Sequence, residues 1–555
     1  MGTYLNPGKE SFQMAVNSEI FVDKTEMILY LNAVVNTQQR FVSVSRPRRF
    51  GKTMAAKMIC AYYDREANSR SLFEESLLSK SNTAHGKMPW DTYLGKFDVI
   101  RIVMTDFLED SDNVTDMTSY LTDEVTTELM NAYPDIDYGK RIKLRTVMNN
   151  IYGRTGRKFV IIIDEWDAIF RVWKEDKEGQ TKYLDFLRDW LKDKDYIALA
   201  YITGILPIKK YGQHSALNMF SEYSMMAPMQ LAKYTGFTSD EVETLCNQYG
   251  RDFTQLREWY DGYEVTDIIP PDPGHEVLKE TGKPRDAERY SLYSPLSVVN
   301  AITTGFIRNY WNKTETYEAL AEYIRLNKAG LKDAVALLMD GGRLRIDAST
   351  YQNDMTTFHS RDDVLSLLIH LGYLGYDQAF SEVFIPNREI LDEFKASTKT
   401  EEWKDSFQSF ELSMELLKAT WAGNENRVAE LAEAAHNRAG NKTYNNEAGL
   451  SYGIQLAYYA AQKYYTTVLE LDSGKGYADI VYLPSPKYSD IPVLLIELKF
   501  DKSADAAINQ IKQQNYPERL AHYKGNILMV GINYNKDISN HASDFKHHSC
   551  KIEKA

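Results

Sequence analysis

The sequence has few cysteines, fewer basic than acidic residues, and no long apolar run. Its three cysteines, Cys60, Cys246 and Cys550, are scattered and form no CxxC pair, which argues against a disulfide framework or a structural zinc site. Apolar stretches such as 159–163 and 492–496 are far too short to span a membrane. The N-terminal MGTYLNPGKE lacks a basic segment followed by an apolar core. We therefore expect a cytoplasmic protein without membrane association.

The charge balance gives no overall basic surface for nucleic acid. Lysine and arginine total 65 against 78 aspartates and glutamates, a net charge of −13. This makes nucleic-acid binding less expected but does not exclude it, because a local groove can be basic. With 555 residues, 43% of them apolar and 26% charged, the chain is expected to fold into several globular domains.

The first half of the chain alternates buried strands with amphipathic helices. Continuous apolar runs separated by helices predict an α/β fold, with a mostly parallel sheet and helices on both faces. The strand candidates are RFVSVS (40–45), FDVIRIVMTDF (97–107), KFVIIIDEWDAIF (158–170) and YIALAYITGI (196–205).

A candidate phosphate-binding loop follows the first of these strands, in SRPRRFGKT (45–53). Its Gly51-Lys52-Thr53 lies where strand gives way to helix, so free backbone N–H groups and the positive helix end can receive phosphate. Lys52 would reach the β- and γ-phosphates of ATP, and Thr53 would offer its hydroxyl to Mg²⁺. Arg46 stands where such loops carry their first glycine, and Gly-Lys-Thr alone is also compatible with a basic surface turn.

A second motif favours the nucleotide site. FVIIIDE places Asp164 and Glu165 at the end of an apolar strand, the Walker B arrangement in which Asp164 holds Mg²⁺ and Glu165 polarises the attacking water. The alternative is an acidic strand end that caps the next helix. Thr203 ends the strand ALAYITG, where it is either a sensor of the γ-phosphate or a buried threonine bonded to backbone.

The middle of the chain carries less chemistry. GFTSDEVETLCNQYG predicts a helix capped by Thr238 or Ser239. DDVLSLLIHLGYLGYD followed by SEVFIPNREI predicts a helix and a two-stranded ribbon, compatible with a winged-helix lid. That helix is poor in arginine and lysine, so we favour inward packing over insertion into a DNA groove, and we interpret His370 as structural.

The C-terminal part predicts a further α/β domain. After about residue 395, helices lead into three strand-like runs, a helix and a last strand. Helix, three strands, helix, strand is the restriction-endonuclease-like order. We therefore expect three regions: a P-loop ATPase-like domain (1–235), a helical, winged-helix-like lid region (236–395) and a nuclease-like domain (396–555).

A charged pair interrupts one of these apolar strands, PVLLIELKF. Strand side chains alternate in direction, so Glu497 and Lys499 share a face about 7 Å apart along the chain, which is costly unless something binds there. Asp479, on the preceding strand of a hairpin, could bring a second carboxylate for Mg²⁺. Lys499 would orient an attacking water or stabilise charge. The alternative is a surface ion pair, because the spacing alone is weak. The same Glu-x-Lys spacing recurs in polar segments at Glu175/Lys177 and Glu402/Lys404.

Several stretches together resemble a known family. FVDKTEMI (21–28), SRPRRFGKT, IIIDEWDA and YITGILPI look like the AAA-ATPase-like domain of a large bacterial family. Members of that family typically carry a C-terminal PD-(D/E)XK nuclease-like domain. The resemblance implies ATP binding, and an Arg-Pro entry is the family's normal form of the loop. The nucleotide-contacting residues it implies are Arg48, Arg49, Phe50, Gly51, Lys52, Thr53 and Asp164. Arg48 and Arg49 would either add charge around the phosphates or remain solvated on a turn.

The nuclease-like resemblance implies a complete motif. Asp479, Glu497 and Lys499 match its catalytic positions, with Asp479 and Glu497 as ligands of Mg²⁺ or Mn²⁺. A helical glutamate, a glutamine and a tyrosine match as accessory residues at Glu447, Gln510 and Tyr516.

Two functions remain open at this point. The first is an ATP-regulated, metal-dependent nuclease acting on nucleic acid, with DNA as the expected substrate. The second is a non-cleaving, nucleotide-dependent binding or regulatory protein that keeps the nuclease-like fold as an interaction platform. A homo-oligomer is compatible with both, because AAA-type ATPases often take an arginine from a neighbouring subunit.

Overall fold

The computed structural model divides the chain into two compact units. Met1–Tyr323 with Arg345–Glu393 form the first, and Ile324–Leu344 with Phe394–Ala555 form the second. The residues that the structure describes are 2–85, 88–140, 142–208, 217–268, 287–311, 317–326, 328–399, 403–439, 447–472, 477–485, 488–514, 520, 526–536 and 547–555. In this part of the chain no helix is long and apolar enough to cross a membrane.

A five-stranded sheet forms the centre of the first unit. Its strand order is β2-β3-β4-β1-β5, and all neighbouring strands are parallel, which confirms the predicted parallel α/β sheet. The three longest strands are buried or nearly buried along their whole length, as parallel strands covered on both faces are. The strands are β1 (Phe41–Ser45), β2 (Asp98–Val103), β3 (Phe159–Asp164), β4 (Ile197–Gly204) and β5 (Ser221–Tyr223).

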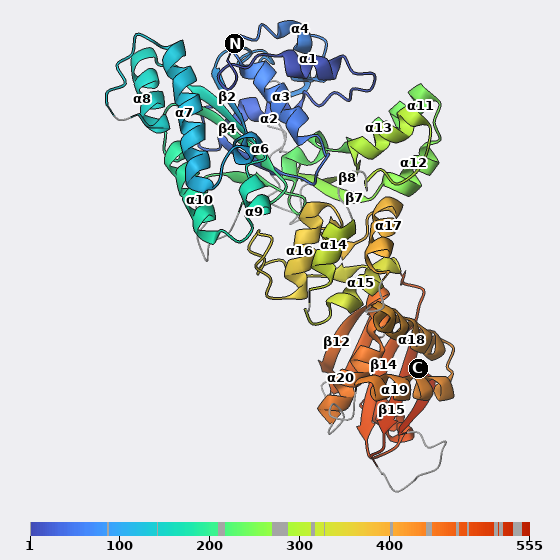
Figure 1. The fold of residues 1–555 in the computed structure, drawn as a ribbon. Helices are drawn as coiled ribbons and strands as arrows, with labels where there is room; N and C mark the ends of the chain where they lie inside the picture. The colour runs from blue at the N-terminus through green and yellow to red at the C-terminus, as the bar shows by residue number, and fades with distance from the viewer. Residues whose placement is uncertain are drawn as a thin grey trace, which may run out of the picture. The chain divides into compact units, whose positions relative to one another are not determined.

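Helices cover both faces of this sheet (Figure 1). Helix α3 packs on β2, β3 and β4, whereas α7, α8 and α10 pack on one another at the other face. The helices are α1 (Glu10–Val16), α2 (Met27–Val34), α3 (Lys52–Tyr63), α4 (Arg70–Phe73), α5 (Leu77–His85), α6 (Met104–Glu109), α7 (Val114–Ala132), α8 (Leu144–Thr155), α9 (Ala168–Val172) and α10 (Lys177–Leu191).

A smaller sheet with helices follows in the same unit. Strands β6, β8 and β7 pair antiparallel in that order. Thr238 caps α11 through a capping box with Glu241, which selects it over Ser239. The elements are η1 (Met229–Tyr234), β6 (Phe237–Thr238), α11 (Ser239–Tyr249), α12 (Phe253–Tyr260), β7 (Tyr263–Ile268), β8 (Ala287–Tyr293) and α13 (Pro295–Thr304).

The predicted helix with a two-stranded ribbon is confirmed. Helix α16 (Arg361–Leu371) precedes the antiparallel strands β10 (Gly375–Asp377) and β11 (Glu382–Phe384). His370 is buried, with its ring stacked 6.0 Å from the ring of Tyr351, as expected of a structural histidine. The remaining elements before residue 400 are α14 (Tyr317–Ile324), α15 (Leu331–Met339), β9 (Leu344–Arg345) and α17 (Arg388–Ser397).

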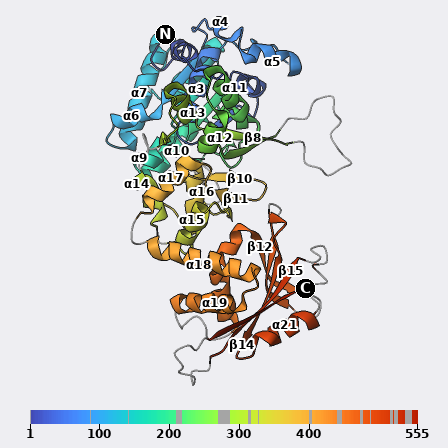
Figure 2. The same cartoon turned by 90° about the vertical axis from the view of Figure 1, so that its right-hand side faces the viewer.

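The second unit contains a mixed sheet of order β12-β13-β14-β15-β16. Only β14 and β15 are parallel among these pairs. Helices α18 and α19 lie on one face and α21 on the other (Figure 2). The last strand, β16, was not predicted. The elements are α18 (Lys404–Trp421), α19 (Glu425–Ala439), α20 (Glu447–Ala457), η4 (Tyr459–Lys463), β12 (Tyr465–Asp472), β13 (Tyr477–Pro484), β14 (Val493–Phe500), α21 (Ala504–Gln513), β15 (Ile527–Tyr534) and β16 (His548–Lys554).

Strand alternation assigns the side chains of β14 to two cores. Leu494 and Ile496 pack in the core beneath α18–α20, whereas Val493 and Leu495 pack with α21. Because alternate residues share a face, Glu497 continues the row of Val493 and Leu495 onto the α21 side.

Candidate functional site

The loop between β1 and α3 has left-handed backbone positions and open space at its glycine. Arg49 and Gly51 have positive φ angles of 67° and 85°, and no heavy atom lies within 4 Å of where a Gly51 Cβ would be. The first N–H groups of α3, from Lys52 to Met54, have no acceptor within the helix. The site therefore offers open space in front of backbone donors and a positive helix end.

Lys52 lies inside this loop with its side chain buried. Its Nζ donates to the carbonyl oxygens of Arg46 at 3.0 Å and Pro47 at 2.8 Å, which leaves one N–H for a further acceptor. Burial lowers the pKa of Lys52 to about 8, against the opposing effect of nearby carboxylates, with Asp167 and Asp164 the strongest. An anionic ligand would supply the negative charge that the buried ammonium needs.

Asp164 faces the start of α3 from the end of β3. It is 1% exposed, and the hydroxyl of Thr53 donates to its carboxylate. Burial raises the pKa of Asp164, although Thr53 and Lys52 oppose this shift. Among the described residues no group bonds to the buried Asp164 Oδ2. The hydroxyl oxygen of Thr53 and the unsatisfied Oδ2 of Asp164 could both bind Mg²⁺. This ion is usually held by one or two carboxylates together with phosphate oxygens.

Glu165 follows Asp164 with a strained backbone and a charged partner. Its φ is 53°, and its Oε2 accepts a hydrogen bond of 2.7 Å from Arg171 Nη2. Arg171 Nε lies 3.3 Å from Asp167 Oδ2. Neither Arg171 nor Asp167 was predicted as a site residue. Their i,i+4 spacing could have predicted an ion pair between them.

Two other predicted nucleotide residues face the protein interior. Thr203 is fully buried, and its hydroxyl donates to the Val44 carbonyl at 3.0 Å. The ring of Phe50 is also buried and meets Tyr263 edge-on at 5.1 Å. Contact of either residue with nucleotide stays a prediction, as it does for Arg48 and Arg49.

Arg46 replaces the first loop glycine with a buried guanidinium. Its Nη1 donates to the carbonyl oxygens of Ser45 and Tyr223 at 2.8 Å, and its Nη2 donates to that of Leu231 at 3.3 Å. Burial lowers the pKa of Arg46 to about 10. The side chain thus ties the loop to β5 and to η1, which a glycine could not do.

Replacing Arg46 by alanine is expected to destabilise the first unit by about 2–5 kcal/mol, because buried carbonyl oxygens lose their donors. Thermal unfolding of the full chain should show an earlier first transition. Arg48→Ala is the matched control, since Arg48 lies exposed on the same loop, and its transition should stay near that of the wild type. Equal transitions in the two variants would show that the Arg46 contacts do not hold the loop.

The second site lies on β13 and β14, where Asp479 and Glu497 meet. Asp479 Oδ2 accepts the backbone N–H of Leu498 at 2.7 Å. Lys499 Nζ lies 2.9 Å from Glu497 Oε1, and both side chains are buried, at 7% and 1% exposure. The predicted trio is therefore brought together.

The carboxylates of this site lack enough positive charge to balance them. Burial and the neighbouring Asp479 raise the pKa of Glu497 to about 7, while Lys499 opposes the shift. Glu497 Oε2 is buried, and no described group bonds to it. A divalent cation would satisfy this oxygen, so the residues present fit Mg²⁺ or Mn²⁺. No cluster of three or more acidic, histidine or cysteine side chains able to hold a metal occurs in the described ranges.

The accessory residues are less completely described. Gln510 lies on α21, the helix that packs on β14. Glu447 begins α20, but its side chain lies outside the described part of the structure, and so does Tyr516. All three accessory roles stay predictions.

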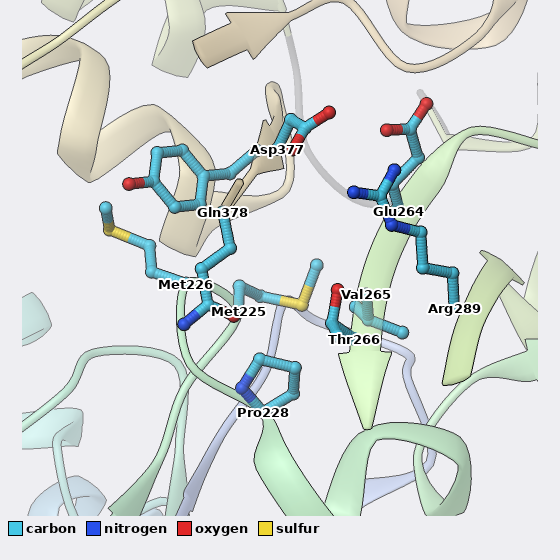
Figure 3. Close-up of a pocket in the computed structure, with 10 residues that line it drawn as sticks. Met225, Met226, Pro228, Glu264, Val265, Thr266, Arg289, Asp377 and Gln378 are labelled. Carbon is cyan, nitrogen blue, oxygen red and sulfur yellow. The ribbon is translucent and has the colours of Figure 1, made fainter. Parts of the chain in front are cut away.

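A small hollow lies elsewhere in the first unit (Figure 3). Met225 and Met226 border one side of it, and Glu264 and Arg289, from β7 and β8, border the other. Its lining does not include Lys52, so it is distinct from the loop site.

Comparisons with known proteins identify a domain around each of the two sites. Residues 8–213 match the family model described as predicted AAA-ATPase, and residues 451–543 match that of the PD-(D/E)XK nuclease superfamily. The chain thus carries an AAA-ATPase-like domain and a nuclease-superfamily domain, which confirms the resemblance found in the sequence. No curated protein matches it.

Several solved structures are distantly similar to this chain. The Walker-type ATPase PABY2304 of Pyrococcus abyssi is 11% identical, with a TM-score of 0.35 over 68% of this chain and 97% of that one. The ORC2 protein of Aeropyrum pernix, in ADPNP–ADP complexes, is 11% identical, with a TM-score of 0.21 over 70% and 98%. Cdc6p from Pyrobaculum aerophilum is 10% identical, with a TM-score of 0.21 over 69% and 93%.

Proposed function

Because the chain carries an AAA-ATPase-like domain followed by a PD-(D/E)XK nuclease-superfamily domain, we propose that it is an ATP-binding, metal-dependent nuclease acting on DNA phosphodiester bonds. One observation carries the proposal. Glu497 Oε2 is a buried carboxylate oxygen to which no described group bonds, while Lys499 pairs with Oε1 of the same carboxylate and the charge of Asp479 acts on it. Burying an unsatisfied carboxylate oxygen costs folding free energy, and a bound cation would offset that cost.

In the nuclease-like site, Asp479 and Glu497 would hold Mg²⁺ or Mn²⁺. The bound ion supplies a Lewis acid that acidifies water and neutralises phosphate charge. Lys499 is buried beside these carboxylates, so its ammonium can donate to a phosphate oxygen as charge develops there. The apolar packing of β14 on both faces holds these side chains on a rigid strand.

In the ATPase-like site, Lys52 and the first N–H groups of α3 would receive the phosphates of ATP. Thr53 and Asp164 would hold the accompanying Mg²⁺, and Glu165 would take a proton from the attacking water. The proposal extends to a cytoplasmic location, nucleic acid as partner of the C-terminal domain, and domain limits of 1–235, 236–395 and 396–555. A homo-oligomer would follow if a neighbouring subunit supplied an arginine.

The test uses the purified full chain with single- and double-stranded DNA and RNA. With Mg²⁺ or Mn²⁺ we expect cleavage of DNA that EDTA abolishes, and a changed rate when ATP is added. Cleavage of RNA alone would overturn the choice of DNA. No cleavage with either metal, with and without ATP, would overturn the nuclease function.

A second function is favoured by the charge of −13 and by Arg46 in place of the loop glycine. The protein would then bind nucleotide and use the nuclease-like fold as a platform. Tight ATP binding without cleavage or hydrolysis would support this alternative.

A further inference from the structure

A line of charged side chains joins the end of β3 to the end of β4. Glu165 Oε2 accepts from Arg171 Nη2 at 2.7 Å, and Arg171 Nε lies 3.3 Å from Asp167 Oδ2. The same Asp167 oxygen accepts the backbone N–H groups of Ile205 at 3.1 Å and Leu206 at 2.9 Å. Glu165 is therefore linked through two side chains to the segment that follows β4.

Burial decreases outward along this line. The side chains of Asp167, Arg171 and Glu165 are 0%, 11% and 37% exposed. Asp167 is also closely packed, since a Cβ on Gly204 would lie 2.5 Å from its Oδ1. Asp167 is thus held in place by backbone N–H groups and close packing, whereas the carboxylate of Glu165 is accessible to solvent.

Arg171 bonds to one carboxylate oxygen of Glu165, which leaves Oε1 to accept a proton. The φ of 53° places its backbone in the left-handed region, a strain of about 1–3 kcal/mol that is common at functional sites. Arg171 engages Oε2 only. The charges of Arg171, Asp167 and Glu165 all act on Lys52, the expected phosphate ligand, so the line lies beside the loop site.

We propose that Arg171 is the positioning residue for Glu165 in ATP hydrolysis, with Asp167 holding Arg171 in place; the inference rests on the proposed ATPase function. A base oriented by a third group is the general arrangement in hydrolytic sites. With Oε2 bonded to Arg171, Oε1 takes a proton from water. The water oxygen bonds to the γ-phosphorus while the bond from that phosphorus to the bridging oxygen breaks, and ADP leaves with the electron pair. ATP and water thus give ADP, phosphate and a proton, which Glu165 then releases to solvent.

Steady-state hydrolysis by variants of the full chain tests this role. Arg171→Ala should lower kcat by about 10- to 100-fold, as a misplaced catalytic group does, with KM within about twofold. Arg171→Lys should recover part of the loss, because an ammonium can pair with Glu165 but does not span both carboxylates. Arg188→Ala is the matched control, since Arg188 makes an equally short ion pair with Asp185 at the surface. It should hydrolyse ATP like the wild type.

A double-mutant cycle separates positioning from a general structural effect. In a Glu165→Gln background, Arg171→Ala should lower kcat no further, because both changes remove the same function. In the nucleotide-free protein, the two changes should lower the melting temperature by less together than the sum of their separate effects.

Each contrary outcome identifies what fails. If Arg171→Ala lowers kcat further in the Glu165→Gln background, or raises KM with kcat unchanged, Arg171 does not act through Glu165. Additive melting-temperature shifts would also overturn the inference. If Glu165→Gln hydrolyses ATP normally, or the wild type does not hydrolyse it, the proposed ATPase chemistry fails and the inference with it.

Discussion

Glu497→Gln is expected to reduce metal-dependent cleavage by more than about 100-fold. Replacing a residue that only supports a metal ligand typically lowers metal affinity or activity by about 10–100-fold. Removing the charge of a ligand itself should lower activity by more. Glutamine keeps the shape of Glu497 but cannot offer a charged Oε2, the oxygen that no described group satisfies. It also leaves Lys499 buried without its carboxylate partner. Cleavage rates and Mn²⁺ titration calorimetry on the full chain would measure both losses.

Glu175→Gln is the matched control for this prediction. Glu175 has the same spacing to Lys177 but is exposed in the first unit, so cleavage should be unchanged. The melting temperature of each variant shows whether it is folded. A folded Glu497→Gln protein that cleaves like the wild type would remove Glu497 from the active site.

Elements with a strong local pattern were predictable from the sequence. The apolar runs of β1, β3 and β4 needed burial on both faces, and this predicted a parallel sheet. The polar residues at the ends of these strands then had to meet, because parallel strands end at one edge. Asp164 indeed pairs with Thr203 in the register of β3 and β4. Alternation along β14 likewise predicted that Glu497 and Lys499 share a face.

Side-chain hydrogen bonds to backbone groups far away in the sequence were not predictable. The partners of Arg46 are carbonyl oxygens of Tyr223 and Leu231, and a carbonyl belongs to every residue, so no residue type signals it. Asp167 binds backbone N–H groups after β4 for the same reason. Strand β16 was missed because its residues are mostly half-exposed, which leaves no clear apolar alternation.

Lys52→Ala is expected to weaken ATP binding by about 30- to 4,000-fold. Removing one partner of a buried charge pair costs about 2–5 kcal/mol, and Lys52 is the buried cation of the loop. The change also frees the carbonyl oxygens of Arg46 and Pro47, so the melting temperature must be measured beside affinity. Lys57→Ala is the matched control on the same helix, where Lys57 is only partly buried. Its affinity should match that of the wild type.

The pH dependence of ATP binding gives an independent check on Lys52. With a pKa lowered to about 8 in the nucleotide-free protein, Lys52 loses its proton as pH rises through 8. A phosphate binds the ammonium form and raises that pKa, because an opposite charge nearby favours the charged form. Wild-type affinity should therefore fall between about pH 7.5 and 9, and binding at pH 8 should take up protons in calorimetry across buffers of different ionisation enthalpy. Lys52→Ala should show neither effect. Proton uptake that persists in the variant would assign the titration to another group and remove Lys52 as the phosphate ligand.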